Sequence, residues 1–544
     1  MSLATSPPQE IASAPGSAWL ARRSTHVAAI LLLALALYAP TLRGTFDFDT
    51  PVLVLYNPAV HGFSLANLRA VLASQPNGVE YLPVRDLTYM LDFDVWGLRA
   101  LGFHLSNVLY YAAGCAALYL LLERVLARWS DRPRALAAAA ALLFVLHPVH
   151  VESVAGIAQR KDVVSGLLCF ASLLAFQAWL ERGGWRPYAL ALGAFVLAVL
   201  AKATAVVVPG LALLAALPHV RRDRRVQAGL AGLGVAAVAL AAFSAAQAVR
   251  SGILWESTAS PWLRALTFGR AAAWYAQKLA APWPLSSIYD LQPVSDPLDA
   301  RALAALAAVV AVAAAAAWKA RRRPVLAFSV GWFLVAVVPV SGLAAAPNLV
   351  ADRYLFVPSV AFCVAAAWVG VHVLAARSRA VAGFAAAAMA LAHAGVVAVR
   401  VVEWRTNGSL LLADVARNPE SARLAGLLGR YHYANRRYAE AFAQFDRARA
   451  IDPEALDAVF YAALFRLESG DPAGALTLLG ALGDLPIVDV QCLLGMALER
   501  LGRVDEARER YERALRANRI MGVIYRTTAA EGAARLAPRG GAAG

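Results

Sequence analysis

The sequence predicts an all-α protein in which a polytopic membrane domain of about eleven transmembrane helices precedes an α-solenoid of helical repeats. Its 544 residues are 60% hydrophobic and only 16% charged, with a mean hydropathy of +0.56. That is more apolar than an ordinary soluble domain. The apolar residues form runs long enough to cross a hydrocarbon layer of about 30 Å. From about Arg417 these runs give way to amphipathic helical patterns that repeat.

Basic residues between the apolar segments predict how the spans are oriented. Every second connection is rich in arginine or lysine, as in 221–225 and 319–323, which is typical of loops retained in the cytoplasm. With a cytoplasmic N-terminus, the large first loop 44–103 and everything after Arg400 face the other side. The segment 261–281 mixes aromatic, basic and apolar residues, so it is predicted to lie in the membrane interface. The predicted spans are 26–43, 104–124, 135–149, 162–180, 187–201, 203–218, 226–249, 301–318, 324–342, 355–376 and 380–400.

These patterns divide the chain into four regions. Residues 1–25 are predicted to be a disordered cytoplasmic N-terminus, 26–400 the membrane domain, 401–527 the repeat domain, and 528–544, rich in Ala and Gly, a disordered tail. The formal charge of +15 comes from short arginine clusters between apolar runs, so it does not predict nucleic-acid binding. The four cysteines lack the CxxC spacing of redox or metal sites. They are predicted core residues: Cys115, Cys169, Cys363 and Cys492.

The C-terminal region repeats at a period close to that of tetratricopeptide repeats, which are pairs of helices. Small residues are needed where paired helices cross closely, and aromatic residues fill the space beside them. Each unit buries its face only against its neighbours, so three units predict a short solenoid with a concave groove. The pattern predicts no ligand, because repeats that only pack on the membrane domain or dimerise have the same signature. The signature residues are Gly429, Tyr438, Ala441, Phe445, Ala448, Pro453, Ala475, Leu479, Gly495, Ala507, Tyr511 and Ala514.

Two carboxylates follow the first predicted span, in the sequence Phe46-Asp47-Phe48-Asp49. Polar groups held against a membrane are costly and therefore informative. A carboxylate in this position is a candidate general base for an acceptor hydroxyl. The structural alternative is that one of the two caps the following turn, which is a common role of Asp.

Three cations are predicted to meet at the same membrane face, where they could hold a phosphate. They are Arg160, Lys202 and Arg353. Their structural alternatives are snorkelling to the membrane surface, or pairing with Asp162 and Asp352.

A metal site is not predicted at this face. His147, His150 and Glu152 do not match the usual catalytic zinc spacings, and Pro148 interrupts the helix that would align them. The further site candidates are Glu80, Arg85, Asp86, His147, His150, Glu152, Asp162, Asp352 and Tyr354.

A series of motifs then gives a family resemblance. In chain order they are FDFD, YLPVRDLTY, GFHLSN, LLFVLHPVHVESVAGIAQRKD, LAKA, DRYLFVPS and EWR, followed by the repeats. From about Phe46 to Ala514 the chain resembles the transmembrane and tetratricopeptide-repeat (TMTC-type) proteins. The resemblance implies a glycosyltransferase of the GT-C fold, and the animal members of that family are protein O-mannosyltransferases.

Two positions depart from the family pattern. Where the family commonly has adjacent acids after the first span, this chain has Asp49-Thr50, with the extra acid moved back to Asp47. Where the family often has Glu after its lysine, Ala203 follows Lys202. Which carboxylate acts therefore stays open, and a helper acid beside the lysine is missing.

The resemblance implies a sugar donor carried on a polyprenyl phosphate. No cofactor is expected, and a metal is not required, because the leaving group carries a single phosphate that protein cations can cover. Asp49, with Asp47 as second choice, would take the proton of the acceptor hydroxyl. Arg353, Arg160 and Lys202 would stabilise the departing phosphate while the anomeric centre inverts. No nucleotide-binding motif is present, which fits a lipid-borne sugar.

Other function classes stay open at this stage. A non-catalytic scaffold that uses the repeats to assemble an envelope complex would keep the fold without needing the site. A transporter is less favoured, because matching halves with broken helices are not evident. The Ala- and Arg-rich composition suggests a bacterial source, an inner-membrane location and periplasmic repeats. The expected partners are a lipid-linked sugar and a polypeptide acceptor or envelope protein.

Overall fold

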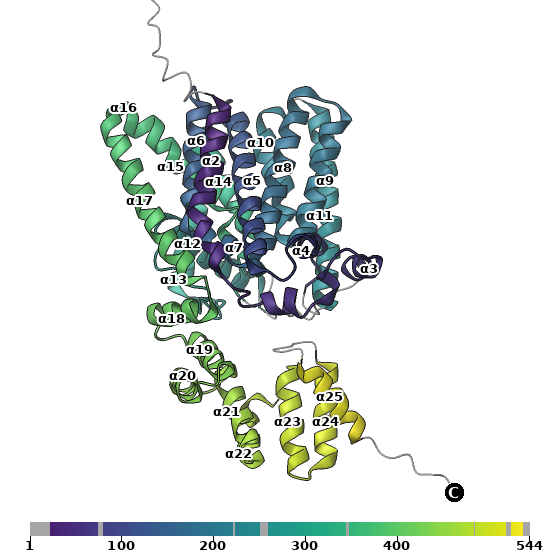
Figure 1. Cartoon of the computed structure of the whole chain (residues 1–544). Coiled ribbons are helices and arrows are strands. Elements are labelled where there is room, and N and C mark those ends of the chain that lie inside the picture. The colour runs from purple at the N-terminus through teal and green to yellow at the C-terminus, as the bar shows by residue number, and fades with distance from the viewer. Residues whose placement is uncertain are drawn as a thin grey trace, which may run out of the picture.

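The chain folds into two bodies of helices joined end to end (Figure 1). The structure is a computed structural model that describes residues 22–73, 80–220, 223–250, 259–343, 348–483, 485–517 and 524–536. The regular elements in these ranges are helices, and helices α2 to α17 form the larger body. The predicted N-terminal segment 1–25 lies outside the described residues as far as residue 21, and its last residues already belong to α2.

The larger body begins and ends with long helices. Its helices are α2 (Arg23–Tyr38), α3 (Leu65–Ala73), α4 (Pro83–Trp96), α5 (Ala100–Leu126), α6 (Pro133–Leu146), α7 (Val151–Ala155), α8 (Arg160–Arg182), α9 (Trp185–Ala201), α10 (Val208–Val220), α11 (Arg224–Arg250), α12 (Pro261–Ala280), α13 (Ala300–Lys319), α14 (Pro324–Val337), α15 (Ser359–Trp368), α16 (Ala375–Arg377) and α17 (Arg379–Glu403).

Eight helical segments among the described residues are long and apolar enough to cross a membrane. A ninth is the pair α6 and α7, which bends by 54° at its break. The remaining two predicted spans coincide with shorter apolar helices, 185–201 and 324–340. A multi-pass membrane protein follows from these helices, while the count of eleven crossings stays a prediction. Helix α12 is not among the candidate spans, which fits its predicted place in the interface.

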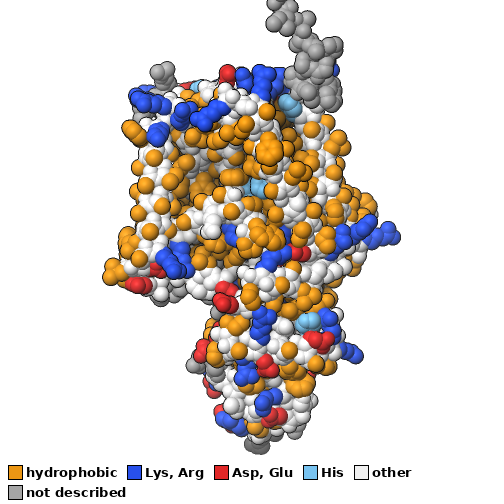
Figure 2. All heavy atoms as spheres, turned by 90° about the vertical axis from the view of Figure 1, so that its left-hand side faces the viewer, with side chains coloured by type: hydrophobic (Ala, Val, Ile, Leu, Met, Phe, Trp, Pro, Cys, Tyr) orange, Lys and Arg blue, Asp and Glu red, His pale blue; other side chains and the backbone are white. Residues whose placement is uncertain are grey.

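A continuous apolar core holds this body together. It is built from α2, α5, α6, α8, α9, α10, α14 and α15, and α5 lies within it with Tyr111, Cys115 and Leu118 fully buried. Small residues allow close approach: a Cβ atom on Gly166 would lie 2.2 Å from the ring of Phe356. Figure 2 shows hydrophobic side chains over the wall of the body, with lysines and arginines gathered at its upper end.

The smaller body is an array of helices that lies beyond α17. They are α18 (Asn407–Arg417), α19 (Ala422–Ala434), α20 (Tyr438–Ile451), α21 (Leu456–Glu468), α22 (Pro472–Leu479), α23 (Val488–Arg500), α24 (Val504–Arg516) and α25 (Ile524–Arg535). Consecutive helices pack as pairs, and the small signature residues face aromatic rings. A Cβ atom on Gly429 would lie 2.5 Å from Phe445, and one on Gly495 would lie 2.7 Å from Tyr511. The tetratricopeptide solenoid is compatible with these pairs and stays a prediction.

Part of the segment predicted to be a disordered tail is helical. Residues 528–535 belong to α25, because Ala529 is fully buried against the core of α23 and α24. A Cβ atom on Gly532 would lie 2.5 Å from the ring of Tyr511, so small residues that suggested disorder serve close packing. Residues 537–544 of the predicted tail lie outside the described residues.

The two bodies are joined by a buried network of charges. Asp414 of α18 is fully buried and accepts hydrogen bonds from the backbone N–H (2.8 Å) and hydroxyl (2.6 Å) of Ser287. Arg400 of α17 donates to Asp414 at 2.8 Å and to Glu403 at 2.7 Å, and Arg417 pairs with Glu403. Breaking such buried pairs is costly, so α18 is held firmly on the membrane body.

Reporter fusions test the predicted orientation. A reporter at Asp223, in a basic loop, is expected on the cytoplasmic side, and one at Asn418, after the last span, on the opposite side. Paired alkaline phosphatase and fluorescent-protein fusions at each position measure this. The same compartment at both positions would contradict the eleven-span topology.

Candidate functional site

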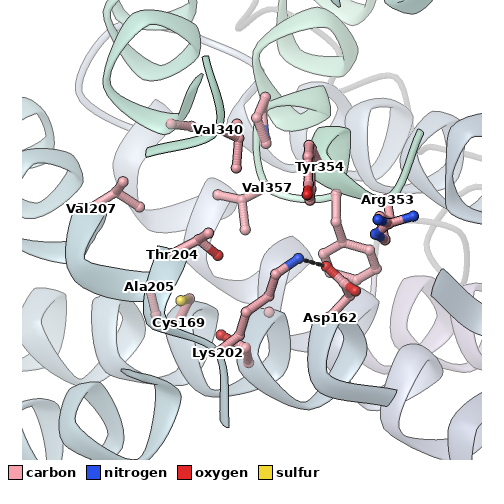
Figure 3. A pocket seen from close by; sticks show the side chains of 15 residues that line it. Asp162, Cys169, Lys202, Thr204, Ala205, Val207, Val340, Arg353, Tyr354 and Val357 are labelled. Carbon is pink, nitrogen blue, oxygen red and sulfur yellow. Dashed lines mark hydrogen bonds and ion pairs between the residues drawn. The ribbon is translucent and has the colours of Figure 1, made fainter. Parts of the chain in front are cut away.

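A small pocket lies between the start of α8, the break after α9 and the turn before α15, and Figure 3 shows the side chains that line it. Its volume is about 390 Å³, including space shared with solvent. Asp162 comes from the first turn of α8, Lys202 from the break between α9 and α10, and Arg353 from the 3-10 turn Asp352–Leu355 before α15. Pro209 lies in the first turn of α10, where its missing N–H is tolerated, so a new helix can begin after the break.

Each cation of the pocket has a carboxylate partner. Lys202 pairs with Asp162 (Figure 3), and Arg353 pairs with Glu152 of α7. Glu152 also accepts the backbone N–H of Arg353 at 2.9 Å. Two groups predicted separately, the HPVHVE and DRYL motifs, therefore meet through this pair. The pairing of Lys202 with Asp162 was one of the alternatives that the sequence left open, whereas Arg353 pairs with Glu152 in place of Asp352.

Tyr354 lies between the two cations. Its ring centroid is 5.3 Å from the ammonium of Lys202 and 5.0 Å from the guanidinium carbon of Arg353. The side chains of Lys202 and Arg353 stay 12% and 14% exposed. An ammonium carries three donors and a guanidinium five, so each cation can bind a further anion without leaving its carboxylate.

Asp352 does not line this pocket and instead contacts a second group of side chains, which includes Tyr289. Its carboxylate accepts a hydrogen bond of 2.8 Å from the hydroxyl of Tyr289. Burial, and secondarily the nearby charge of Glu152, raises the pKa of Asp352 to about 7. The ammonium of Lys278 lies 5.2 Å from the ring of Tyr289, so α12 is tied to the edge of the site.

Arg160 does not line the pocket. Its guanidinium is fully buried and pairs with Asp92 at 2.5 Å. It also donates to the side-chain oxygen of Asn107 at 2.6 Å and to the backbone oxygens of Phe103 and Thr88. Because the N–H groups of Arg160 are used by these protein partners, its guanidinium is not available to bind the phosphate of a sugar donor. We therefore remove it from the predicted phosphate site and assign it the role of fastening α4 and α5 to α8.

Glu80, Arg85 and Asp86 form another internal network. Arg85 is fully buried and contacts Glu80 at 2.7 Å and Asp86 at 2.8 Å. The ammonium of Lys161 lies 2.8 Å from Glu80. Burial by itself would raise the pKa of Glu80, but Lys161 and Arg85 hold it at about 2. Glu80 therefore stays ionised as the partner of two cations, which favours a structural role.

The two histidines and Glu152 have separate partners. His147 contacts the backbone oxygen of Leu279 at 3.1 Å, and His150 contacts the hydroxyl of Ser359 at 2.9 Å. Glu152 binds Arg353. The described residues contain no group of three or more His, Cys, Asp or Glu side chains that could hold a metal ion. The ring centroids of His147 and His150 lie 5.9 Å apart, and each of the two rings and Glu152 is engaged with a different partner.

The first-loop carboxylates lie against the junction of the two bodies. The backbone N–H of Phe48 donates to the side-chain oxygen of Asn407 at 2.8 Å, and the Phe48 ring lies 5.8 Å from that of Trp404. Phe48 has a φ of +51°, which is strained for a residue with a side chain. The hydrogen bond and ring contact hold the loop in this conformation.

Asp47 and Asp49 differ in their surroundings. Asp47 is half-buried and accepts a hydrogen bond of 2.5 Å from the Thr45 hydroxyl, whereas Asp49 is exposed. Burial raises the pKa of Asp47 to about 7, although the hydrogen bonds from the Thr45 hydroxyl and from the backbone of Asn407 oppose the shift. Asp47 thus has the properties of a base that works near neutral pH.

One chain of contacts links this loop to the pocket. Trp404 packs beside Phe48 and also beside Gly156, where a Cβ atom would lie 3.4 Å from the indole and 2.9 Å from the backbone oxygen of Glu152. Sequence reasoning did not assign roles to Trp404 or Asn407. Trp404 could have been found, because it belongs to the EWR motif. Asn407 belongs to no motif, so nothing in the sequence pointed to it.

Changing Asp92 to Asn tests the structural role of Arg160. The change leaves a buried guanidinium without its counter-charge and is expected to cost about 3–5 kcal/mol of stability. Thermal unfolding in detergent measures it, with Asp94→Asn on the exposed side of the same helix as the control. Equal melting temperatures for both variants would contradict the structural assignment.

Several curated proteins that are similar to this chain are named protein O-mannosyl-transferases. Protein O-mannosyl-transferase TMTC1 of Mus musculus is 30% identical over 154 residues, which are 27% of this chain and 16% of that protein. Tmtc1 of Drosophila melanogaster is 30% identical over 181 residues, covering 32% of this chain and 20% of that protein. TMTC2 of Homo sapiens is 31% identical over 154 residues, covering 26% and 18%. The matched stretch thus spans a fifth or less of these relatives.

Comparison with family models and solved structures adds little. No protein-family model matches the chain. The crystal structure of ArnT from Cupriavidus metallidurans bound to undecaprenyl phosphate is 14% identical, with a TM-score of 0.41, and the match covers 95% of this chain and 88% of that one. This likeness is too slight to assign a fold. Over the matched stretch, the chain is similar to TMTC-type protein O-mannosyl-transferases, the family that its motifs predicted.

Proposed function

We propose that the chain is an integral-membrane glycosyltransferase of the GT-C type that moves one sugar from a polyprenyl-phosphate carrier to a hydroxyl acceptor. The observation that carries the proposal is the pocket in which Lys202 and Arg353 flank Tyr354 with part of each cation open. Charge-assisted hydrogen bonds from such donors are strongest in a site shielded from water. The sequence similarity to protein O-mannosyl-transferases supports this class of reaction and a polypeptide acceptor.

In the proposed reaction, the acceptor oxygen attacks the anomeric carbon while the bond from that carbon to the phosphate oxygen breaks. The hydroxyl proton passes to a first-loop carboxylate, and the bonding electrons leave with the phosphate. The displacement inverts the anomeric centre. Arg353 and Lys202 neutralise the additional charge that develops on the leaving phosphate. Protein cations cover a single phosphate, so the scheme uses neither a metal nor a nucleotide.

Asp47 is our preferred base, and Asp49 is the second choice. The sequence favoured Asp49, which matches the family position more closely. The preference changes because Asp47 is half-buried, is oriented by Thr45 and has a pKa of about 7. A base with a pKa near the working pH is ionised yet still basic enough to accept a proton.

The repeats are proposed to bring the acceptor to this site on the non-cytoplasmic side of a bacterial inner membrane. Their first helix, α18, is fastened to the membrane body through Asp414, and the neighbouring Asn407 holds the first loop. A polypeptide bound along the repeats would therefore lie on a body that is rigidly connected to the carboxylates.

A membrane scaffold is the second candidate function. The observation that favours it is the pairing of both pocket cations with carboxylates of the chain itself. Ion pairs that only fasten helices together look the same. The two functions differ in whether the cations also bind an exogenous phosphate.

Removing the Lys202 and Asp162 charges together tests the proposal. The double variant Lys202→Gln, Asp162→Asn keeps a polar pair but takes away the ammonium, so donor affinity is expected to fall about 10- to 100-fold, the range for one hydrogen bond to a charged group. Purified full-length protein is incubated with polyprenyl-phosphate mannose, and donor binding and consumption are followed by mass spectrometry.

The exposed pair Arg503 and Glu506 gives a matched control. Arg503→Gln with Glu506→Gln removes the same charges far from the pocket and is expected to leave donor binding unchanged. Wild-type protein that neither binds nor consumes this donor or its analogues with other sugars would favour the scaffold.

A further inference from the structure

A second pocket lies at the opposite end of the membrane body. It is lined by the ends of α2, α5, α6 and α8 and encloses about 1440 Å³, including open solvent. Helix α8 connects the two pockets, because Asp162 in its first turn lines the first and Arg182 at its end lines the second. Twenty residues of helix span about 30 Å. The two pockets are therefore about one hydrocarbon thickness apart.

Glu123 organises the cations of this second pocket. Its side chain is only 8% exposed and binds Arg23 at 2.7 Å and Arg134 at 2.8 Å. Arg23 begins α2 and Arg134 lies in the first turn of α6, so one carboxylate fixes two guanidinium groups from different helices. Arginines that only keep a loop in the cytoplasm do not need to be held in place by a buried carboxylate.

Three more arginines complete the lining. A terminal nitrogen of Arg124 is buried without a hydrogen-bond partner, and Glu181 lies 3.7 Å from it. Arg132 lies 3.8 Å from Asp131, and Arg182 ends α8. The pocket thus holds five arginines against the three carboxylates of Glu123, Asp131 and Glu181, an excess of positive charge with a buried donor still to be satisfied.

We propose that this pocket binds the phosphodiester headgroup of an anionic phospholipid in the leaflet at this end of the protein. Guanidinium groups bind phosphate through paired hydrogen bonds, and basic pockets between the ends of transmembrane helices lie at headgroup depth. Leu32 lies further along α2 than Arg23 and is 66% exposed on the outer face of this helix. That face offers an apolar surface for the acyl chains of the lipid. Among the described lining residues, His26 is the sole aromatic ring, so a nucleotide base has little to stack on.

The test compares two double variants of the full-length protein. Arg132→Gln with Arg182→Gln removes two pocket arginines without touching the Glu123 pairs. Arg321→Gln with Arg322→Gln removes two exposed arginines from the basic connection between α13 and α14, which is predicted to face the same side. Binding to nanodiscs or micelles doped with phosphatidylglycerol or phosphatidylcholine is measured by native mass spectrometry and by the shift in melting temperature.

The wild type is expected to retain phosphatidylglycerol over phosphatidylcholine. The pocket variant is expected to lose about tenfold in affinity, as for one charge-assisted hydrogen bond, while the control variant keeps the wild-type value. Equal losses in both variants, or no preference in the wild type, would overturn the proposal. Inorganic phosphate that stabilises the wild type as much as the lipid does, and displaces it, would assign the pocket to a free phosphate. None of these outcomes depends on glycosyl transfer.

Discussion

Replacing Asp47 by Asn is expected to lower glycosyl transfer by about two to four orders of magnitude, because an amide cannot accept the hydroxyl proton. Asp49→Asn, which changes an exposed side chain two residues away, is expected to have a much smaller effect. Transfer from polyprenyl-phosphate mannose to a hydroxyl-bearing peptide is measured with each purified variant. Unchanged transfer by the double variant would remove both carboxylates from the mechanism, and loss in Asp49→Asn alone would return the role of base to Asp49.

The pH dependence gives this prediction an independent signature. The pKa of Asp47 is raised to about 7, and a general base acts in its deprotonated form. The value of kcat/KM in the wild type is therefore expected to rise with pH through about 7 and to level off above it. The residual activity of Asp47→Asn should lack this rise. A profile that keeps its inflection in the variant would assign the titration to another group.

Asn407 offers a way to disturb the base without touching it. Its side-chain oxygen holds the backbone of Phe48 between the two carboxylates. Asn407→Ala is expected to release the strained conformation of Phe48 and to lower kcat about tenfold, the order of one lost hydrogen bond to a positioned group, with the donor KM unchanged. Asn407→Asp keeps an acceptor and should restore some of the lost kcat. A rise in donor KM with unchanged kcat would contradict a positioning role.

The membrane helices could be predicted because hydropathy is a local property. Each of the predicted apolar segments falls on a helix or on a bent pair of helices. The breaks that create the site also fall between or beside predicted spans, since Lys202 lies between α9 and α10 and Arg353 in the turn before α15, but the groups that surround these breaks could not be predicted. Interrupted backbone at membrane depth is tolerated only where protein or a cavity satisfies it, which depends on neighbours distant in sequence.

The partners of the charged residues could not be read from the sequence. Glu152 and Arg353 are 201 positions apart, and nothing local distinguishes that pair from the predicted pairing of Arg353 with Asp352. Arg160, the first residue of α8, was predicted to bind phosphate because it was expected to meet Lys202 and Arg353 at one membrane face. Asp92, Asn107 and two backbone oxygens instead use its donors. Motifs thus indicated which residues matter, and only the fold separates binding residues from those that fasten helices.

Arg353→Lys is expected to lower donor turnover by about 10- to 100-fold, although it keeps the positive charge. A guanidinium meets a phosphate with two parallel hydrogen bonds, and an ammonium cannot reproduce that geometry. The loss of one charge-assisted hydrogen bond accounts for a change of this size. Donor binding and turnover by the purified variant measure the effect, and Arg270→Lys, at a half-exposed pair with Asp299, is the control. Normal binding and turnover by Arg353→Lys would defeat the phosphate role.

Glu152→Gln then separates a phosphate-binding arginine from one that only fastens α7 to the turn before α15. The amide oxygen of Gln can still accept the backbone N–H of Arg353, but the guanidinium loses the negative charge with which it now pairs. The unliganded variant is therefore expected to melt at a lower temperature than the wild type. If Arg353 binds the donor, the phosphate replaces the missing charge, so the donor should raise the melting temperature more in Glu152→Gln than in the wild type. A purely structural Arg353 predicts the same instability with no additional rescue by the donor.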